Sequence, residues 1–450
     1  FRGALDVQAS AINEEMKIAA VHALAKLAKQ EVPEYVSKAY GGRRFKFGPE
    51  YIIPTPFDSR VLLWVSPAVA RAAMDSGVAR QKIDLDEYIV LLEKRLGVRQ
   101  SFTRSIKEKI FLSESEEEKK PRQLPKIVFP EGANTRILMA ADIILQEDIA
   151  LPILLGNQKR IEAAIDKLGL TNLRKKAVFI APSQSEKRQS YADQFWEFRQ
   201  RRGLSHDQAY SMMKNENYYG SMMVRRGDAD GLLSGVTQSY PDTIRPFLEV
   251  VGARKGMKIA GVYMMLFKDR TLFFADTTVN IDPSASDLAD IAICAAEEAR
   301  FFDIEPKVAM LSFSNFGSNG HPLARKVSEA TRLIKLRRPD IMVDGEMQAD
   351  TAVVPEIVDE TFPFCEIKGG ANVLIFPDLQ SANISYKLMQ RVGGAEAIGP
   401  ILVGMNKPIN VLQRSADVDE IVNMAIITVL EIQKMQEMGT SHQRGATRPA

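Results

Sequence analysis

The chain has 450 residues, of which 45% are hydrophobic, 26% charged and 8% aromatic, a globular composition that excludes collagen-like, low-complexity and largely disordered proteins. With 59 Lys and Arg against 57 Asp and Glu, the formal net charge of +2 argues against a general nucleic-acid binder but permits a local basic cleft for an anionic ligand. At about 150 residues per domain, the length indicates two to four domains.

The cysteine content and the ends of the chain bear on its compartment. Two cysteines, Cys294 and Cys365, are too few for a disulfide framework and indicate a reducing, cytoplasmic environment. No apolar run approaches the roughly 18–20 residues that span a bilayer, so we expect no membrane partner. The chain begins at Phe1, without a basic and then apolar leader, and we expect it to be a fragment of a longer protein.

The first hundred residues contain helical patterns. Apolar residues recur at helical spacing over 11–30, where Asn13 or Ser10 could cap the helix. The later elements expected here are a short strand at 61–65, a helix at 67–76 closed by Gly77, and a helix at 84–96 between Asp84 and Gly97.

A charged segment at 113–123 interrupts the chain. Its sequence, SESEEEKKPRQ, contains no apolar residue, so it cannot bury enough surface to order itself. It predicts a linker or an exposed loop, and the alternative is a solvated helix end.

Strands and helices alternate after this segment. Strands are expected at 126–129, 151–155, 177–180, 308–313, 372–376 and 401–403. Helices are expected at 135–146, 159–168, 284–302, from Leu323 onward, 385–392 and 418–435. Such alternation predicts an α/β fold with right-handed crossovers and mainly parallel sheets, whose ligands bind beyond the carboxyl ends of the strands.

Several common site motifs are missing from the sequence. There is no G-x-G-x-x-G, Walker A or G-x-S-x-G motif. The four histidines are not spaced for a metal site. We therefore expect no metal site, dinucleotide site, P-loop or standard serine-hydrolase nucleophile within these residues.

Two segments could bind an anion. Gln238–Thr243 leads into Arg245, and helix-start N–H groups beside a guanidinium suit phosphate or carboxylate. The alternative is that Asp242 only caps a helix that carries an exposed Arg. Arg199, in FRQRRG, could serve the same purpose or belong to a solvated helix face.

A third loop follows a strand at 312–321. Its sequence, SFSNFGSNGH, suits a backbone that approaches a ligand, and an ordinary surface turn is an equal alternative.

From about Pro125 to Met438, the chain resembles phosphate acetyltransferases (phosphotransacetylases). The similar words, in order, are GDADGLLSG at 227–235, DTIRP at 242–246, DGEMQ at 344–348, ANVLIFPDL at 371–379 with Tyr386-Lys387, and 399–402 with Lys407-Pro408. The resemblance implies an α/β, two-lobed fold with parallel-rich sheets, like that of isocitrate and isopropylmalate dehydrogenases. One lobe would comprise 125–257 with 399–440, and the other 258–398.

The first hundred residues resemble the carboxyl-terminal end of a malic enzyme, through FRGALDV and AINEEM within 1–16 and YIIPTPFDSRV at 51–61. Together the two parts resemble the carboxyl-terminal part of the hybrid bacterial NADP-dependent malic enzymes. Residues 1–98 would then be the remnant of a dinucleotide-binding lobe, with an exposed sheet edge and apolar surface, and 99–124 the linker. The parent's catalytic residues and its sites for NADP and Mg or Mn would lie mostly outside this chain.

The resemblance also implies site residues. Acetyl-CoA or its phosphates would contact Arg199, Arg245, Arg414, Ser239, Ser314 and Gly317. Arginine suits such polyanions because its planar fork grips phosphate oxygens in pairs.

The chain departs from the family at positions that carry the chemistry. Against a family word close to DLSRGCSDxDIV, this chain has VLQRSADVDEIV at 411–422, so Gln413 replaces the catalytic Ser and Glu420 replaces an Asp that takes the thiol proton. Gln238 replaces a His, and Tyr240 replaces a Thr. The family loop STKGS is SNFGS here, at 314–318, and lacks its Lys.

Thiol attack on an acyl phosphate needs a base and oxyanion donors, whereas binding needs mainly the arginines and the cleft. We therefore expect a catalytically degenerate domain that binds acetyl-CoA or CoA and inhibits the attached malic enzyme, which converts malate to pyruvate. One alternative is an active phosphate acetyltransferase in a bifunctional protein, and another is a pure oligomerisation module. The family implies self-association as a dimer or a higher oligomer.

Overall fold

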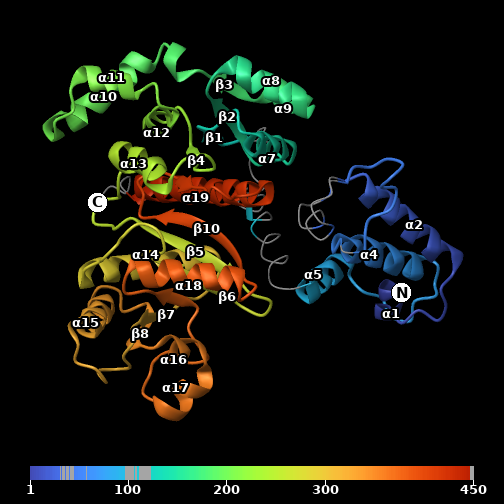
Figure 1. Ribbon diagram of the computed structural model, residues 1–450. Helices are drawn as coiled ribbons and strands as arrows, with labels where there is room; N and C mark the ends of the chain where they lie inside the picture. The colour runs from blue at the N-terminus through green and yellow to red at the C-terminus, as the bar shows by residue number, and fades with distance from the viewer. Residues whose placement is uncertain are drawn as a thin grey trace. The chain divides into compact units, whose positions relative to one another are not determined.

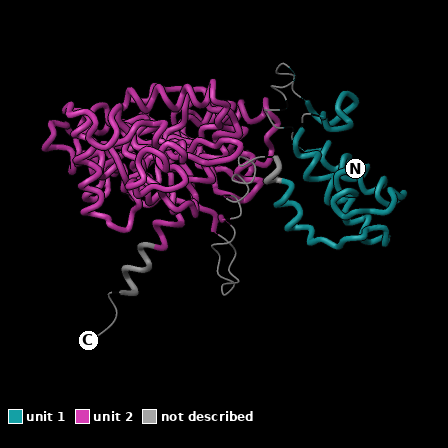
Figure 2. Tube along the Cα trace, turned by 90° about the horizontal axis from the view of Figure 1, so that it is seen from below, with its two compact units in different colours: residues 1–105 teal, residues 106–450 magenta. Residues whose placement is uncertain are grey.

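The computed structural model describes residues 1–30, 32, 36, 40, 45–56, 58–96, 106, 109–110 and 123–445. The chain divides into two compact units, Phe1–Ser105 and Ile106–Ala450 (Figure 2). The expected linker at 113–123 lies outside the described residues, apart from Gln123. In the described part of the chain, no helix is long and apolar enough to cross a membrane.

Unit 1 is built from helices in its described residues. These are α1 (Arg2–Asp6), α2 (Glu14–Ala28), α4 (Arg60–Asp75) and α5 (Leu85–Leu96). Asn13, one of the two expected caps, accepts the backbone N–H of Met16 at 3.1 Å and starts α2. Asp84 caps α5 as expected, since its Oδ1 accepts the N–H groups of Asp86 and Glu87.

The strand expected at 61–65 is wrong, because these residues begin helix α4. A short apolar run fits a strand and a packed helix equally well, and its neighbours decide between them. Here α4 packs on α1 and α2, and Gly3 allows a close approach, since a Cβ at Gly3 would lie 2.1 Å from the carbonyl oxygen of Ser66. Pro67, expected near a helix start, lies inside α4.

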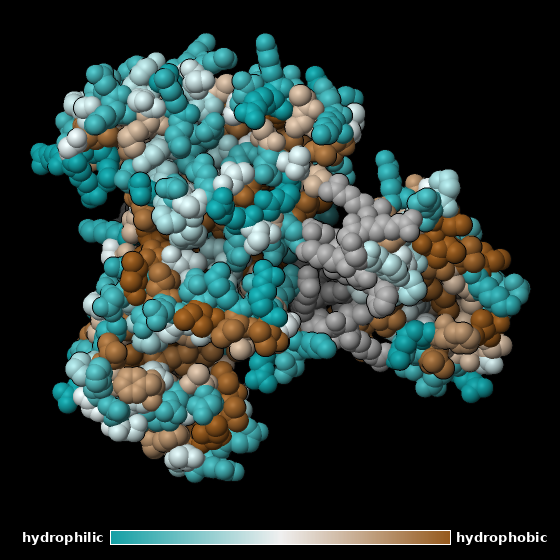
Figure 3. Space-filling model, viewed as in Figure 1, coloured by the Kyte–Doolittle hydropathy of each residue, from teal (hydrophilic) through white to brown (hydrophobic). Residues whose placement is uncertain are grey.

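The exposed apolar surface expected for this region is present. Leu5, Ile18 and Val21 are 68%, 53% and 62% exposed, and hydrophobic residues gather on the face of unit 1 drawn in Figure 3. The expected sheet edge is not found among the described residues of unit 1, whose strand-like pairing is the bridge between Gly48 and Tyr51.

Unit 2 begins with a parallel sheet. Its strand order is β11-β4-β1-β2-β3, with β1 (Lys126–Phe129), β2 (Leu151–Leu155), β3 (Val178–Ile180), β4 (Gly231–Ser234) and β11 (Ile409–Val411). The helices of this lobe are α7 (Thr135–Gln146), α8 (Gln158–Leu168), α9 (Thr171–Lys176), α10 (Arg188–Arg199), α11 (His206–Met212), α12 (Glu216–Arg226), α13 (Tyr240–Val250) and α19 (Val418–Gly445), with 3-10 turns at Pro182–Gln184 and Gln200–Arg202.

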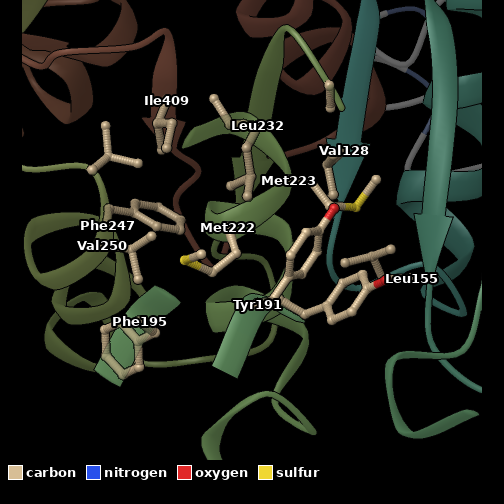
Figure 4. Packing of buried hydrophobic residues seen from close by; sticks show 14 of the residues in the cluster. Val128, Leu155, Tyr191, Phe195, Met222, Met223, Leu232, Phe247, Val250 and Ile409 are labelled. Carbon is tan, nitrogen blue, oxygen red and sulfur yellow. The ribbon is translucent and has the colours of Figure 1, made fainter. Parts of the chain in front are cut away.

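The core of this lobe lies between its strands and the helices α10, α12 and α13 (Figure 4). Tyr191, Phe195 and Phe247 are at most 2% exposed and pack with Met222 and Leu232. Burying aromatic side chains of this size supplies several kcal/mol of apolar transfer energy in total. This packing fixes α13, on which the candidate site depends.

The second sheet is mixed. Its order is β10-β5-β6-β9-β7-β8, with β5 (Ala260–Leu266), β6 (Thr271–Ala275), β7 (Lys307–Leu311), β8 (Met342–Met347), β9 (Val373–Ile375) and β10 (Glu396–Val403). Its helices are α14 (Ala285–Phe301), α15 (Pro322–Arg337), α16 (Ala349–Val353), α17 (Pro355–Thr361) and α18 (Leu379–Arg391). In Figure 1, α19 runs between the elements of the first sheet and strand β10, both of which it contacts.

The α/β, two-lobed architecture with parallel-rich sheets is therefore confirmed. Among the described strands, β5 pairs antiparallel with both β6 and β10, and the other pairings are parallel. Residues 399–403, which the resemblance placed in the first lobe, belong to β10, and the last three of them pair with β5 in the second sheet. The chain thus crosses between lobes after β10 rather than before it.

Candidate functional site

Helix α13 organises the basic part of the site. Ser239 caps it, since the Ser239 Oγ accepts the backbone N–H of Asp242 at 3.4 Å and donates to Asp242 Oδ2 at 2.5 Å. The cap is therefore Ser239, and Asp242, the cap named in the sequence alternative, lies in the first turn. Arg245 is exposed one turn further along the helix.

Arg199 and Tyr218 meet around the carboxylate of Glu249, near the end of α13. Arg199 Nη2 lies 3.5 Å from Glu249 Oε1, and the hydroxyl of Tyr218 donates to Glu249 Oε2 at 2.7 Å. Burial and then Glu249 raise the pKa of Tyr218, and the charges of Arg245 and Arg199 oppose this rise. Both arginines therefore act electrostatically on the same side chain, from α10 and α13.

Arg414 lies at the start of the same helix. Its Nη2 is 3.5 Å from the carbonyl oxygen of Thr237, two residues before the cap of α13. Arg136, from α7, joins the loop that contains Arg414 to the loop that precedes α13. It donates to the carbonyl oxygens of Arg414 at 3.0 Å and of Val236 at 3.3 Å. The three expected arginines thus lie along α13, at its beginning, its second turn and its end.

Glu131 holds the loop that leads into α13. Its carboxylate accepts the backbone N–H groups of Gly235 at 2.8 Å, Val236 at 3.0 Å and Thr237 at 2.6 Å, and the Thr237 hydroxyl at 2.5 Å. Consecutive N–H groups of this kind form an anion-binding nest, and here the protein's own carboxylate fills it.

The two positions that the resemblance marked as altered, Gln413 and Glu420, share a pocket. Its other lining residues are Glu396, Ala397, Ile398, Gly399, Leu412, Ala416, Asn423 and Met424. The pocket therefore lies between β10, the loop after β11 and the first turns of α19.

Gln413 is bonded across the two lobes. Its Nε2 donates to the hydroxyl of Tyr263, on β5, at 2.5 Å. The Tyr263 ring stacks on Tyr386 with centroids 4.3 Å apart, and burial holds the pKa of Tyr263 well above its ordinary value. A neutral phenol and an amide thus meet at the position where the resemblance implied a catalytic hydroxyl, and neither is a ready base or nucleophile at neutral pH.

Glu420 is used to cap α19. Its Oε2 accepts the N–H of Asp417 at 3.0 Å, and Asp417 Oδ1 accepts the N–H of Glu420 at 2.9 Å. This reciprocal pair has the geometry of a capping box, in which the acidic side chain satisfies an N–H group at the helix start. A proton acceptor for a thiol would have to give up or share this bond.

Ser314 and Gly317 are both bonded to one buried glutamate. The Ser314 hydroxyl donates to Glu346 Oε1 at 3.0 Å, and the N–H of Gly317 donates to the same oxygen at 2.7 Å. Glu346 is 2% exposed and Ser314 is 1% exposed. The loop after β7 is therefore closed on itself, and these two donors face Glu346 rather than open space.

The two other departures also have partners. Gln238 Oε1 accepts Asn217 Nδ2 at 2.8 Å, and the hydroxyl of Tyr240 donates to Thr278 Oγ1 at 2.8 Å. Tyr240 thereby links α13 to the second lobe. Both replacements carry polar contacts within the protein.

Glu131, Arg136 and Glu346 also shape the site, but they were not among the site residues predicted from the sequence. Glu131 follows the correctly predicted strand at 126–129, and Glu346 lies in the sequence DGEMQ that carries the family resemblance. Their positions in the sequence were therefore a usable signal for both. Their partners are distant in sequence, and no local pattern reports such contacts. In the described part of the chain, no group of three or more His, Cys, Asp or Glu residues is placed to hold a metal ion.

Comparison with known proteins gives the relationships of this chain. It is 42% identical over 439 residues to the NADP-dependent malic enzyme of Salmonella typhimurium, which covers 96% of this chain and 56% of that protein. It is 41% identical over 307 residues to the phosphate acetyltransferase of Bacillus subtilis, covering 68% of this chain and 94% of that protein. The chain thus spans about half the length of the malic enzymes that it matches.

A solved phosphotransacetylase from Streptococcus pyogenes has the same fold. Its structure matches with a TM-score of 0.69 at 38% identity, over 75% of this chain and 99% of that one. The model of the phosphate acetyl/butaryl transferase family matches residues 107–429, which is most of the chain. On this evidence the chain belongs to the phosphate acetyl/butaryl transferase family.

Proposed function

We propose that unit 2 is an acyl-CoA-binding regulatory domain that has lost most phosphate acetyltransferase activity. The observation that carries this proposal is the pocket of Gln413 and Glu420, in which the amide is bonded to Tyr263 and the carboxylate caps α19. A family site without a free nucleophilic hydroxyl or a free base can still hold its ligand.

Binding is supported by the arrangement along α13. Arg245 and Arg414 are exposed, and Arg199 retains 18% side-chain exposure beside Glu249. CoA and acyl phosphates are polyanions, which arginines grip through paired, charge-assisted hydrogen bonds. We assign Arg199, Arg245 and Arg414 to the phosphates of CoA, and the pocket of Gln413 to its acyl end.

Catalysis is disfavoured by the same contacts. In acetyl transfer the thiol sulfur of CoA loses its proton and bonds to the acyl carbon, while the carbon–oxygen bond to phosphate breaks. The proton needs an acceptor and the developing oxyanion needs donors, each of which is worth about a hundredfold or more in rate. The Gln413 amide already donates one of its N–H groups to Tyr263, and Glu420 carries its carboxylate one methylene further than an Asp would.

The proposed target of regulation is a malic enzyme within a longer, cytoplasmic protein. This rests on the similarity to NADP-dependent malic enzymes over 96% of the chain. Such a parent would decarboxylate malate to pyruvate with NADP and Mg or Mn, bound mostly outside this chain, and would assemble as a dimer or higher oligomer. We propose inhibition by acetyl-CoA, because pyruvate and NADPH are made upstream of it, with a coupling of about 1–3 kcal/mol.

Calorimetric titration of this chain with acetyl-CoA tests binding. We expect saturable binding that Arg245→Ala weakens about tenfold or more, since a lost charge-assisted bond is worth about 1.5–3 kcal/mol. Arg391→Ala, an exposed arginine at the end of α18 in the other lobe, is the matched control and should leave the affinity unchanged. Absence of binding at high micromolar concentrations would refute the proposal, and a chain that self-associates yet ignores CoA would favour an oligomerisation module.

A second candidate is a working phosphate acetyltransferase, which the 41% identity to the Bacillus subtilis enzyme favours. Under this candidate the double variant Gln413→Ser with Glu420→Asp would change the transfer rate little. Under our proposal the unmodified chain is nearly inactive, and the double variant raises the rate by at least about tenfold. Comparing the transfer rates of the unmodified chain and the double variant separates the two candidate functions, because both chains keep the same arginines.

A further inference from the structure

A second pocket lies at the junction of the two lobes, apart from the residues assigned to acyl-CoA. It is formed by α14, the end of β10 with the following turn, and α19. Its lining residues are Arg254, Cys294, Glu297, Glu298, Leu402, Val403, Gly404, Met405, Lys407, Glu431, Lys434 and Met435. Acidic side chains from both lobes therefore face one cavity.

Glu298 and Glu431 are the acidic groups with the poorest compensation. Glu298, on α14, is 5% exposed, and its Oε1 is buried without a hydrogen-bond partner among the described residues. Its Oε2 lies 3.6 Å from Lys434 Nζ, beyond ordinary hydrogen-bond length. Glu431, on α19, has a 2.6 Å bond from Asn410 Nδ2. Among these contacts, no lysine or arginine donates a short hydrogen bond to either carboxylate.

Other charged and titratable groups also line this pocket. Lys434 also lies over the ring of Phe301, 4.4 Å from its centroid. Glu297 is paired with Arg338 at 2.7 Å. The remaining titratable groups facing the pair are Arg254 from the loop after α13, whose Nε is buried without a partner among the described residues, the exposed Lys407 from the turn after β10, and the thiol of Cys294 on α14.

When both are ionised, two carboxylates that line the same pocket repel each other, and a proton bound to one of them relieves the repulsion. We propose that Glu298 and Glu431 form a proton-binding site shared by the two lobes, and that the bound proton keeps α14 and α19 together near neutral pH. A protonated carboxyl can also donate a hydrogen bond, which an ionised one cannot. Loss of this proton loosens the junction, independently of whether acyl-CoA binds.

The pH dependence follows from the direction of the shifts. Burial, and next the charge of Glu298, raises the pKa of Glu431 to about 8, with Asn410, Lys434 and Arg254 opposing the rise, and burial raises the pKa of Glu298 as well. The folded chain therefore holds a proton that the unfolded chain releases near 4.5, the ordinary value for Glu. Stability falls as the pH rises through this interval, and the loss is complete above the folded pKa.

Thermal unfolding of the chain between about pH 5 and pH 9 tests the proposal, with Glu431→Gln and Glu298→Gln as near-isosteric neutral variants. We expect the wild-type melting temperature to fall with pH by at least about 3 °C more than that of Glu431→Gln. Glu297→Gln lines the same pocket but removes a group that is already paired, so it should keep the wild-type slope. Parallel pH profiles of the wild type and both Gln variants would overturn the proposal.

Infrared difference spectroscopy supplies a readout that does not depend on the variants' stability. At neutral pH the folded wild type should show a protonated-carboxyl stretching band that disappears on titration to about pH 9 and is reduced in Glu431→Gln. A band that is identical in the wild type and in both variants would place the protons on other groups and would contradict the shared site.

Discussion

Replacing Glu131 with Ala tests how the site is held together. The change removes the acceptor of three backbone N–H groups and of the Thr237 hydroxyl. Thr237 is exposed, so water can replace its bonds, whereas Gly235 and Val236 are buried. Two buried N–H groups left unpaired cost about 1–3 kcal/mol each, so we expect a loss of about 3–5 kcal/mol in the free energy of unfolding.

Urea unfolding followed by circular dichroism measures this loss as a lower midpoint at an unchanged slope. Glu186→Ala, at an exposed glutamate in the same lobe, is the matched control and should stay within about 0.5 kcal/mol of the wild type. Because the loop leads into α13, Glu131→Ala should also weaken acetyl-CoA binding. A stability loss below about 1 kcal/mol would refute the view that Glu131 holds this loop.

Two further predictions concern backbone space and thiol burial. Gly235 has φ +136° and a Cβ there would lie 2.2 Å from the carbonyl oxygen of Leu412, whereas Gly203, at φ +86°, has no atom within 4 Å of its Cβ position. We expect Gly203→Ala to cost about 1–2 kcal/mol and Gly235→Ala at least about 3 kcal/mol in urea unfolding; equal costs would contradict the close approach. Burial raises the pKa of Cys294 to about 12 and also raises that of Cys365. A thiol-reactive dye at pH ~8 should therefore label both thiols slowly in the folded chain and quickly in urea. Fast labelling of the folded chain would contradict this burial.

Part of the secondary structure of unit 2 could be predicted from local patterns. The helix at 135–146 and the strands at 126–129 and 151–155 match the structure at both ends. Asn134 and Ser284 cap their helices, and such caps are local signals that a sequence shows directly. Elements whose ends carry cap or turn residues were therefore the ones located best.

The errors arose where distant contacts decide. Residues 61–65 are helical because α4 packs on α1 and α2, which no five-residue window shows. Strand β10 is longer than expected and antiparallel to β5, although strand patterns carry no information on partner or direction. The alternation of strands and helices predicted mainly parallel sheets and did not show which strands would pair antiparallel.

The candidate site was predictable only in part. The resemblance named Gln413 and Glu420, and the structure places both in one pocket. It also named Ser314 and Gly317 as ligand contacts, but their partner in the structure is Glu346, about 30 residues away in the sequence. The nest around Glu131 spans more than a hundred residues, so only the folded chain brings it together.

The most direct test of the central claim is to measure binding and turnover on one preparation of this chain. Acetyl-CoA is titrated by calorimetry, and the same sample then receives CoA and acetyl phosphate while thioester formation is followed. We expect saturable acetyl-CoA binding together with thioester formation no faster than in the protein-free control. Turnover well above that control, or no binding, would contradict an acyl-CoA-binding domain that has lost its transferase chemistry.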